Sequence, residues 1–378
     1  MRRKGMRRRD RYGYHTYYGG GGPSPVIKVI VIVLAVVVLS LILTIWGLQR
    51  YMVYSSDGGK LELPWAQQTD DGSGSAQPQE GGAASEPDVS AVVTSGGSDV
   101  PQEPANTEDM VRAVPLTREE LLGGDVSGLL EQKGANGVVL EMKESSGKLA
   151  YASQLDMARE LGVSELDATG QEVAQAVRNL KDQGTYLIAY VDCFQDHAMS
   201  GKDAFSFSTT YGYHWMDDTD VGWGNPTKTE VRDYLTGIVG ELAAMGFDEI
   251  LLDNAGYPTR GNLEYIQTGS DYDATQFASV IGDFYTKAAQ AATAGGAKLS
   301  AVTDQSTIQT GSNAHSGQTL ENLSGLSRVW LTPDAGADVT ALTRTVTEAG
   351  MNDYPLGVLT STLETGRSYY QAVLAAED

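Results

Sequence analysis

Short apolar runs alternate with amphipathic segments over the C-terminal part of the chain. Runs of Val, Ile and Leu predict strands that are buried on both faces, as in a parallel sheet. We expect seven strands, at residues 111–116, 137–142, 185–191, 249–253, 298–303, 327–331 and 356–360. Apolar residues spaced by three and four predict helices at 121–132, 171–182, 228–245, 275–293, 339–349 and 369–376.

This alternation of strands and helices predicts parallel pairing, and the length of residues 111–378 suits a (β/α)₈ TIM-type barrel. An eighth strand is not evident. Either it lies within residues 204–223 or the barrel is incomplete or distorted. A doubly wound open sheet is the structural alternative, which is disfavoured because no glycine-rich phosphate loop follows the first strand.

Residues 29–48 form a different pattern, twenty consecutive residues without a charge. A helix of that length crosses a hydrocarbon layer of about 30 Å. Basic residues precede it, so the positive-inside rule predicts a cytoplasmic N-terminus and an extracellular C-terminal domain. We therefore expect an uncleaved signal anchor at 29–50 in the cell membrane. A cleaved signal peptide is the rival interpretation, but its basic region would be unusually long and no A-x-A site follows.

The formal net charge of −22 is unevenly distributed. Residues 1–28 hold eight basic residues and one acid, a net charge of +7, so the remaining 350 residues carry −29. An acidic domain repels phosphate backbones, so nucleic acid is not an expected partner. The sequence thus predicts a basic cytoplasmic tail at 1–28. Residues 51–110, rich in Gly, Ser, Pro and acids, predict a disordered linker before the folded domain.

Carboxylates follow several of the predicted strands. In a TIM-type barrel the active site lies at the C-terminal ends of the strands. Glycoside hydrolysis requires one carboxylic acid to protonate the leaving oxygen and one carboxylate to attack or activate water. Asp253 is the strongest candidate, because it ends an apolar strand and precedes a Gly-Tyr-Pro turn. The other strand-end acids are Glu141, Asp192, Asp304 and Asp334. A structural alternative is that these acids cap helices and form turns.

The long loop after the third strand is rich in aromatic residues. It contains Tyr211, Tyr213, His214, Trp215 and Trp223. Sugar rings pack their C–H faces on aromatic rings, so this loop suits carbohydrate. Alternatively, the rings pack the loop onto the barrel.

Metal and cofactor sites are not expected. The four His show no His-x-x-x-His spacing, the acids form no EF-hand pattern, and there is no G-x-S-x-G motif. The single cysteine, Cys193, excludes an intrachain disulfide, and at a buried strand end it is expected to act as a small apolar residue.

Three segments resemble conserved blocks of the DUF4015 glycoside hydrolase domain, a barrel of bacterial surface proteins. They are GANGVVLEMKESSGKLAY at 134–151, YLIAYVDCFQD at 186–196, and WGNP at 223–226 with EVRDYLTGIVGELAAMGFDEILLD at 230–253. The resemblance covers about residues 112–365. It departs from the family pattern after Asp253, where the family has Tyr-x-Arg-Phe-Pro and this chain has residues 254–258, Asn-Ala-Gly-Tyr-Pro. It also departs at Tyr190, where the family has Arg, and at Val302, where the family has an acid.

The resemblance implies a membrane-anchored extracellular glycoside hydrolase that acts on polysaccharide or peptidoglycan. Asp253 would be nucleophile or base and Asp304 the general acid. The residues expected to bind sugar are Glu141, Asp192, Tyr257, Trp215, Trp223 and Asp334. A catalytically inactive carbohydrate-binding or cell-wall-associated barrel is the second hypothesis, and an enzyme of another class on the same scaffold is the third.

Overall fold

The computed structural model describes residues 52–55, 58–61, 110–165, 168–351 and 354–375. The chain divides into two units, residues 1–96 and 97–378. In the first unit, β1 (Met52–Ser55) and β2 (Gly58–Leu61) pair antiparallel. The predicted tail, the anchor and most of the linker lie outside the described residues. Among the residues that are described, no helix is both long and apolar enough to cross a membrane.

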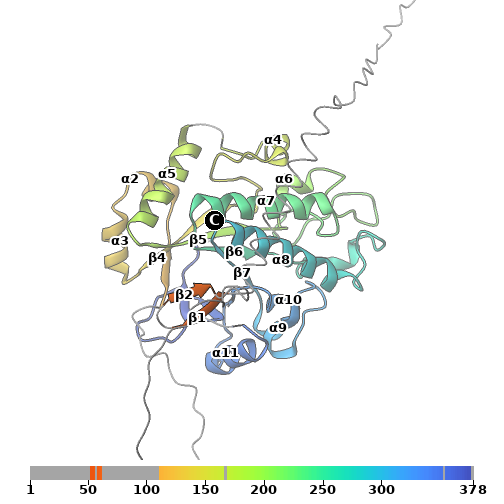
Figure 1. Cartoon of the computed structure of the whole chain (residues 1–378). Helices are drawn as coiled ribbons and strands as arrows, with labels where there is room; N and C mark the ends of the chain where they lie inside the picture. The colour runs from red at the N-terminus through yellow and green to blue at the C-terminus, as the bar shows by residue number, and fades with distance from the viewer. Residues whose placement is uncertain (1–51, 56–57, 62–109, 166–167, 352–353, 376–378) are drawn as a thin grey trace, which may run out of the picture. The chain divides into compact units, whose positions relative to one another are not determined.

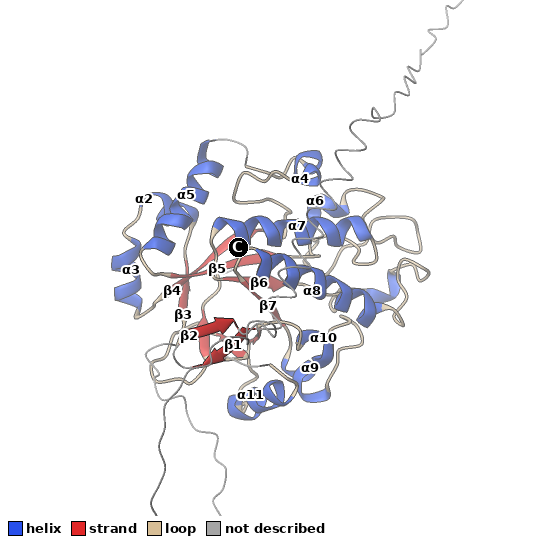
Figure 2. Cartoon of the chain, viewed as in Figure 1, coloured by secondary structure: helices blue, strands red, loops and turns tan. Residues whose placement is uncertain are grey.

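The second unit is a closed barrel of eight parallel strands (Figures 1 and 2). Around the barrel the order is β10-β3-β4-β5-β6-β7-β8-β9. The strands are β3 (Arg112–Pro115), β4 (Gly137–Lys143), β5 (Tyr186–Asp192), β6 (Glu249–Asp253), β7 (Lys298–Val302), β8 (Arg328–Leu331), β9 (Leu356–Leu359) and β10 (Tyr370–Ala372). The predicted TIM-type barrel is therefore confirmed, and the barrel is complete.

The eighth strand is β10, in residues for which the periodicity predicts a final helix at 369–376. That prediction is wrong. Gln371 pairs with Val358 of β9 on one side and with Arg112 of β3 on the other, so β10 closes the barrel. Pairing with two strands distant in sequence overrides the local helical pattern. Residues 204–223 contribute isolated bridges and no barrel strand.

The predicted helices are present apart from the last, with two refinements. The range 121–132 is two helices, because Gly124 is extended and the Asp125 side chain caps the second helix. The structure also contains four short helices that the periodicity did not predict, namely α4, α6, α9 and α10. The helices are α2 (Arg118–Gly123), α3 (Val126–Lys133), α4 (Asp156–Leu161), α5 (Ala168–Asp182), α6 (His197–Ser200), α7 (Thr229–Met245), α8 (Phe277–Ala294), α9 (Gln305–Thr310), α10 (Leu320–Leu323) and α11 (Val339–Glu348), with a 3₁₀ turn at Leu263–Tyr265.

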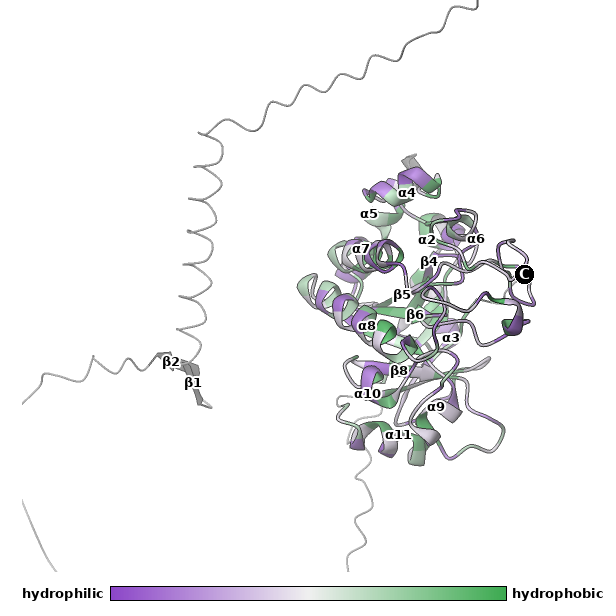
Figure 3. Ribbon diagram, turned by 90° about the vertical axis from the view of Figure 1, so that its right-hand side faces the viewer, coloured by the Kyte–Doolittle hydropathy of each residue, from purple (hydrophilic) through white to green (hydrophobic). Residues whose placement is uncertain are grey.

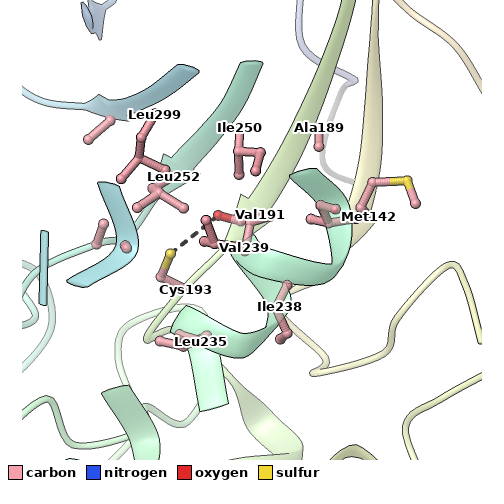
Figure 4. Packing of buried hydrophobic residues seen from close by; sticks show 14 of the residues in the cluster. Met142, Ala189, Val191, Cys193, Leu235, Ile238, Val239, Ile250, Leu252 and Leu299 are labelled. Carbon is pink, nitrogen blue, oxygen red and sulfur yellow. Dashed lines mark hydrogen bonds between the residues drawn. The ribbon is translucent and has the colours of Figure 1, made fainter. Parts of the chain in front are cut away.

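Alternate residues of each strand face the helices and the barrel interior. The outward residues pack against helices such as α7, where Leu235 and Val239 lie beside Val191 and Leu252 (Figure 4). Cys193 is fully buried in this layer and its Sγ lies 3.6 Å from the Val191 carbonyl. In Figure 3, α7 and α8 carry both apolar and polar colouring, as expected of helices with one face on a sheet.

The inward residues include a second apolar cluster and a buried ion pair. Glu249 of β6 and Arg328 of β8 are both fully buried and joined by a salt bridge. Tyr186 Oη and Trp330 Nε1 donate hydrogen bonds to the Glu249 carboxylate at 2.8 and 2.7 Å. The Arg328 guanidinium also lies 3.8 Å from the centre of the Tyr370 ring. Burial opposes ionisation of Glu249, but Arg328 and these donors hold the pKa of its carboxyl below the ordinary value.

The Trp330 ring fits in the barrel interior because the residue that faces it on β9 is a glycine, Gly357. A Cβ added to Gly357 would lie 2.3 Å from Cε3 of Trp330, inside any real contact distance. The fully buried indole is held at its other end by Glu249. Gly357 is therefore required by packing, not by backbone conformation.

We predict that Gly357→Ala destabilises the fold by about 1–3 kcal/mol, the usual cost of overpacking a core. Urea unfolding of the purified chain measures this. Gly240→Ala is the matched control, because a Cβ there meets nothing closer than the Ala291 Cβ at 4.0 Å and α7 gains a better helix former. Equal stability of the two variants would show that Trp330 can move aside.

Candidate active site

Three acids meet at the C-terminal ends of β4, β5 and β6. In the strand register Glu141 pairs with Tyr190, and Asp192 pairs with Asp253. The Tyr190 hydroxyl donates a hydrogen bond of 2.7 Å to Asp253 Oδ2. Burial, followed by the charges of Asp253, Asp192 and Glu141, raises the pKa of the Tyr190 phenol far above its ordinary value. Tyr190 is therefore a neutral donor surrounded by three carboxyl groups.

Asp253 is half-buried and faces a second donor. The backbone N–H of Asn254 donates to Asp253 Oδ1 at 2.7 Å. Asn254 has a φ of 45°, in the left-handed region that Asn tolerates better than most residues. This conformation lets one residue hold Asp253 with its main chain and turn its side chain toward β5.

Asp192 lies beside Asp253 in a different environment. It is 3% exposed, and Asn254 Nδ2 donates to its Oδ1 at 3.0 Å. Burial raises the pKa of the Asp192 carboxyl well above its ordinary range; nearby Lys143 opposes the shift and Asp253 adds to it. The burial of Asp192 thus favours its protonated form.

Lys143 is a buried cation beneath this site. Its Nζ donates 2.6 Å to the Asp192 carbonyl and forms a 2.9 Å ion pair with Asp196. Both side chains are fully buried, so each charge depends on the other. The hydrogen bond of Lys143 to the Asp192 carbonyl ties the end of β5 to the end of β4.

A chain of hydrogen bonds links the long loop to the acids. Asp217 Oδ2 accepts from Gln195 Nε2 at 2.7 Å and from Trp223 Nε1 at 2.8 Å. A carboxylate only accepts, so the Gln195 amide must present its nitrogen to Asp217 and its oxygen to Asn254. Asn254 Nδ2 donates to that oxygen at 3.1 Å as well as to Asp192. The orientation of both amides is thereby determined from the loop.

The other two predicted acids make separate contacts. Asp304 follows β7, is exposed, and accepts from Thr307 Oγ1 at 3.0 Å and from Asn313 Nδ2 at 2.9 Å. Asp334 is exposed past β8, where its N–H donates to Gln305 Oε1 at 3.1 Å. The catalytic role predicted for Asp304 and the sugar-binding role predicted for Asp334 remain predictions.

The aromatic residues expected to bind sugar are buried. Trp215, Trp223 and Tyr257 are 2%, 3% and 1% exposed. Trp215 Nε1 donates to the Asn262 carbonyl at 3.0 Å, and Tyr257 stacks on Phe277 with ring centres 3.6 Å apart. Trp215 and Trp223 pack the loop onto the barrel, which is the second of the two interpretations of the aromatic loop, whereas Tyr211 and Tyr213 of the same loop are exposed. Their contact with sugar stays a prediction.

The residues that sequence reasoning did not select are Tyr190, Asn254, Gln195, Asp217 and Lys143. One signal existed for Tyr190, which stands two residues before Asp192 and so shares its face of β5. Gln195 and Asp217 meet only through loop conformation, for which the sequence carries no periodic signal. In the part of the chain that is described, no group of three or more His, Cys, Asp or Glu residues is arranged to hold a metal ion.

Comparison with known proteins gives one family match. The DUF4015 model, described as "Putative glycosyl hydrolase domain", matches residues 117–329. No curated protein matches the chain.

Solved structures give distant matches. A hypothetical protein from Ruminiclostridium thermocellum is 22% identical, with a TM-score of 0.41, over 50% of this chain and 96% of that chain. A GH20 exo-β-N-acetylglucosaminidase from Vibrio harveyi in complex with N-acetylglucosamine is 11% identical, with a TM-score of 0.44, over 67% of this chain and 41% of that chain. Ega3 from Aspergillus fumigatus in complex with galactosamine is 13% identical, with a TM-score of 0.38, over 69% and 80%.

The raised pKa of Asp192 predicts a specific pH dependence of stability. The folded protein keeps a proton that the unfolded chain releases near pH 4. This contribution is complete below that pH and is lost as the pH rises toward the raised pKa. Asp192→Asn removes the titration, so the free energy of unfolding of the variant relative to wild type should increase between pH 4 and pH 8. Urea unfolding at several pH values measures the difference, and a difference that does not change with pH would contradict the prediction.

Proposed function

Because the chain belongs to the DUF4015 family of glycosyl hydrolase domains, we propose that it is a glycoside hydrolase acting through the strand-end carboxylates of β4, β5 and β6. The observation that carries the proposal is the meeting of Glu141, Asp192 and Asp253 around the Tyr190 hydroxyl. Glycosidic bond cleavage requires a carboxylic acid and a carboxylate, and the C-terminal rim of a barrel is where active-site residues lie.

The two Asp residues suit complementary roles. Burial raises the pKa of the Asp192 carboxyl well above its ordinary range, which favours the protonated form, and Asp192 is the candidate donor to the leaving oxygen. Asp253 receives hydrogen bonds from Tyr190 and from the Asn254 N–H, which stabilise its negative charge, and it is the candidate nucleophile or base. Glu141 is exposed on β4 and is the candidate to bind a sugar hydroxyl. Similar side chains thereby acquire different functions from their environments.

A non-catalytic carbohydrate-binding barrel is the second candidate function. The burial of Asp192 to 3% exposure favours it, because so little surface limits contact between that carboxyl and a substrate. This chain also lacks the Arg of the family motif after Asp253.

Loss of activity on substitution of the acids tests the catalytic proposal. The purified full chain would be incubated with peptidoglycan and a panel of polysaccharides, and released reducing ends would be counted. We expect Asp253→Asn and Asp192→Asn to lower the rate by about 100-fold or more, as for removal of a general acid or base. Asp218→Asn, an exposed acid of the long loop, is the control.

The same assay decides the role of Asp304. A loss in Asp304→Asn equal to that in Asp253→Asn, with Asp192→Asn active, would make Asp304 the proton donor. Binding without release, equal in wild type and Asp253→Asn, would exclude the enzyme and leave the carbohydrate-binding barrel.

We further propose that residues 29–48 anchor the chain in the cell membrane with the barrel outside. Their uncharged apolar sequence and the preceding basic residues support this. The full chain should sediment with membranes after carbonate washing, and external protease should reach the barrel. Deletion of 29–48 should release the protein, whereas deletion of 75–94, a linker segment of equal length, should not. Sedimentation of both deletion variants with membranes would contradict the anchor.

A further inference from the structure

The exposed large apolar side chains of the described residues gather on two adjoining loops. They are Tyr211 at 77%, Tyr213 at 74%, Tyr265 at 48% and Met216 at 46% exposure. Single exposed apolar residues are ordinary, but several rings on one pair of loops indicate an interaction surface. We call these four residues the tyrosine surface.

The two loops are held together by main-chain hydrogen bonds. Thr210 N–H donates to the Tyr265 carbonyl at 2.9 Å, and Gln267 N–H donates to the Ser208 carbonyl at 2.8 Å. Within the first loop, Thr209 N–H donates to the Tyr213 carbonyl at 2.7 Å, which closes a turn around Tyr211. The backbone that carries the exposed rings is therefore fixed before any partner binds.

A layer of buried rings supports these loops. Phe207 contacts Trp215, Tyr257 and Tyr272, with ring centres 6.4, 6.2 and 5.6 Å apart. The chain thus buries one set of aromatic residues and exposes another on the same loop. Interior packing explains the buried set and leaves the exposed set without a structural role.

The loop that carries Tyr211 and Tyr213 also reaches the candidate active site. It contains Asp217, which orients Gln195, and Gln195 accepts from the Asn254 amide that contacts Asp192. The loop that carries the exposed rings is therefore tied by hydrogen bonds to the residues that orient Asp192 and Asn254.

The charge of these loops limits the kind of ligand. Residues 201–223 hold four acids and one Lys, and residues 260–273 hold three acids and one Arg, a combined net charge of −5. Of these acids, Asp217 is buried and Asp271 is paired with Lys228, and the others keep the surface acidic. Such a surface repels polymers that carry carboxylate, sulfate or phosphate groups. Exposed tyrosine faces among acidic residues suit sugar rings that are neutral or carry amines.

We propose that the tyrosine surface binds a polysaccharide chain that has no acidic groups, and that it extends the candidate active site along that chain. The inference rests on the proposed function for its substrate class. Tyr211 and Tyr213 supply the stacking faces, and the surrounding acids exclude anionic polymers.

Affinity electrophoresis of the purified full chain tests this surface. The probes are chitosan and hydroxyethyl cellulose, with alginate as the anionic polymer. We expect retardation by at least one of the first two and none by alginate at low salt. The double variant Tyr211→Ala and Tyr213→Ala should bind about tenfold more weakly, whereas Tyr211→Phe and Tyr213→Phe together should bind as wild type. Tyr369→Ala, which alters a half-buried tyrosine just before β10, is the matched control.

Several outcomes would overturn the tyrosine surface: no retardation by either non-anionic polymer, retardation by alginate, or unchanged binding by the double Ala variant. A wild-type dimer that the double Ala variant cannot form, detected by sedimentation, would make a second copy of the chain the occupant instead. The Asp253→Asn variant separates this inference from the catalytic proposal. Tyrosine-dependent binding without hydrolysis would retain the surface and reject the enzyme, and hydrolysis with tyrosine-independent binding would do the reverse.

Discussion

The buried ion pair between Glu249 and Arg328 is the constraint on which the barrel depends. Two charges without solvent are tolerated only when every nearby partner is in place. Here the partners come from five strands: Tyr186 from β5, Glu249 from β6, Arg328 and Trp330 from β8, Gly357 from β9 and Tyr370 from β10. A one-residue shift of β6 or β8 would turn Glu249 or Arg328 outward and leave the other charge unpaired, and a shift of β5, β9 or β10 would remove an uncharged partner. The pair therefore fixes the strand register, and the register places Asp192 beside Asp253.

The two ends of the barrel interior differ in how their charged side chains are paired. Near the start of β6, an acid is matched by a cation and held ionised. At the ends of β4, β5 and β6, three acids meet, and the buried cation Lys143 is paired with Asp196. Crowded like charges are unfavourable, and the protein accommodates them by burying Asp192 and giving Asp253 two donors. The ion pair that stabilises one end of the barrel thus supports the crowded carboxyl groups at the other end.

The sequence predicted the barrel because its strands are continuous apolar runs and its helices have clear amphipathic spacing. It failed at β10, whose three residues are too short to show a period and whose identity depends on β3 and β9. Among the candidate site residues, Glu141, Asp192 and Asp253 could be selected because parallel strands bring their C-terminal ends to one rim. Whether Trp215 and Trp223 would be buried, and that Gln195 would connect Asp217 to Asn254, depends on loop conformation, which no repeating pattern encodes.

Closure of the barrel by β10 affects how each molecule folds during synthesis. Arg112 and Gln371 are paired although they lie 259 residues apart in the sequence. During synthesis, β3 and β9 keep an open hydrogen-bonding edge until the residues of β10 have emerged, and contacts of such long range form slowly. For that interval the nascent barrel presents strand edges that can pair with other chains. A short, late strand thus makes the chain's exposure to aggregation, as well as its final stability, sensitive to changes near Tyr370.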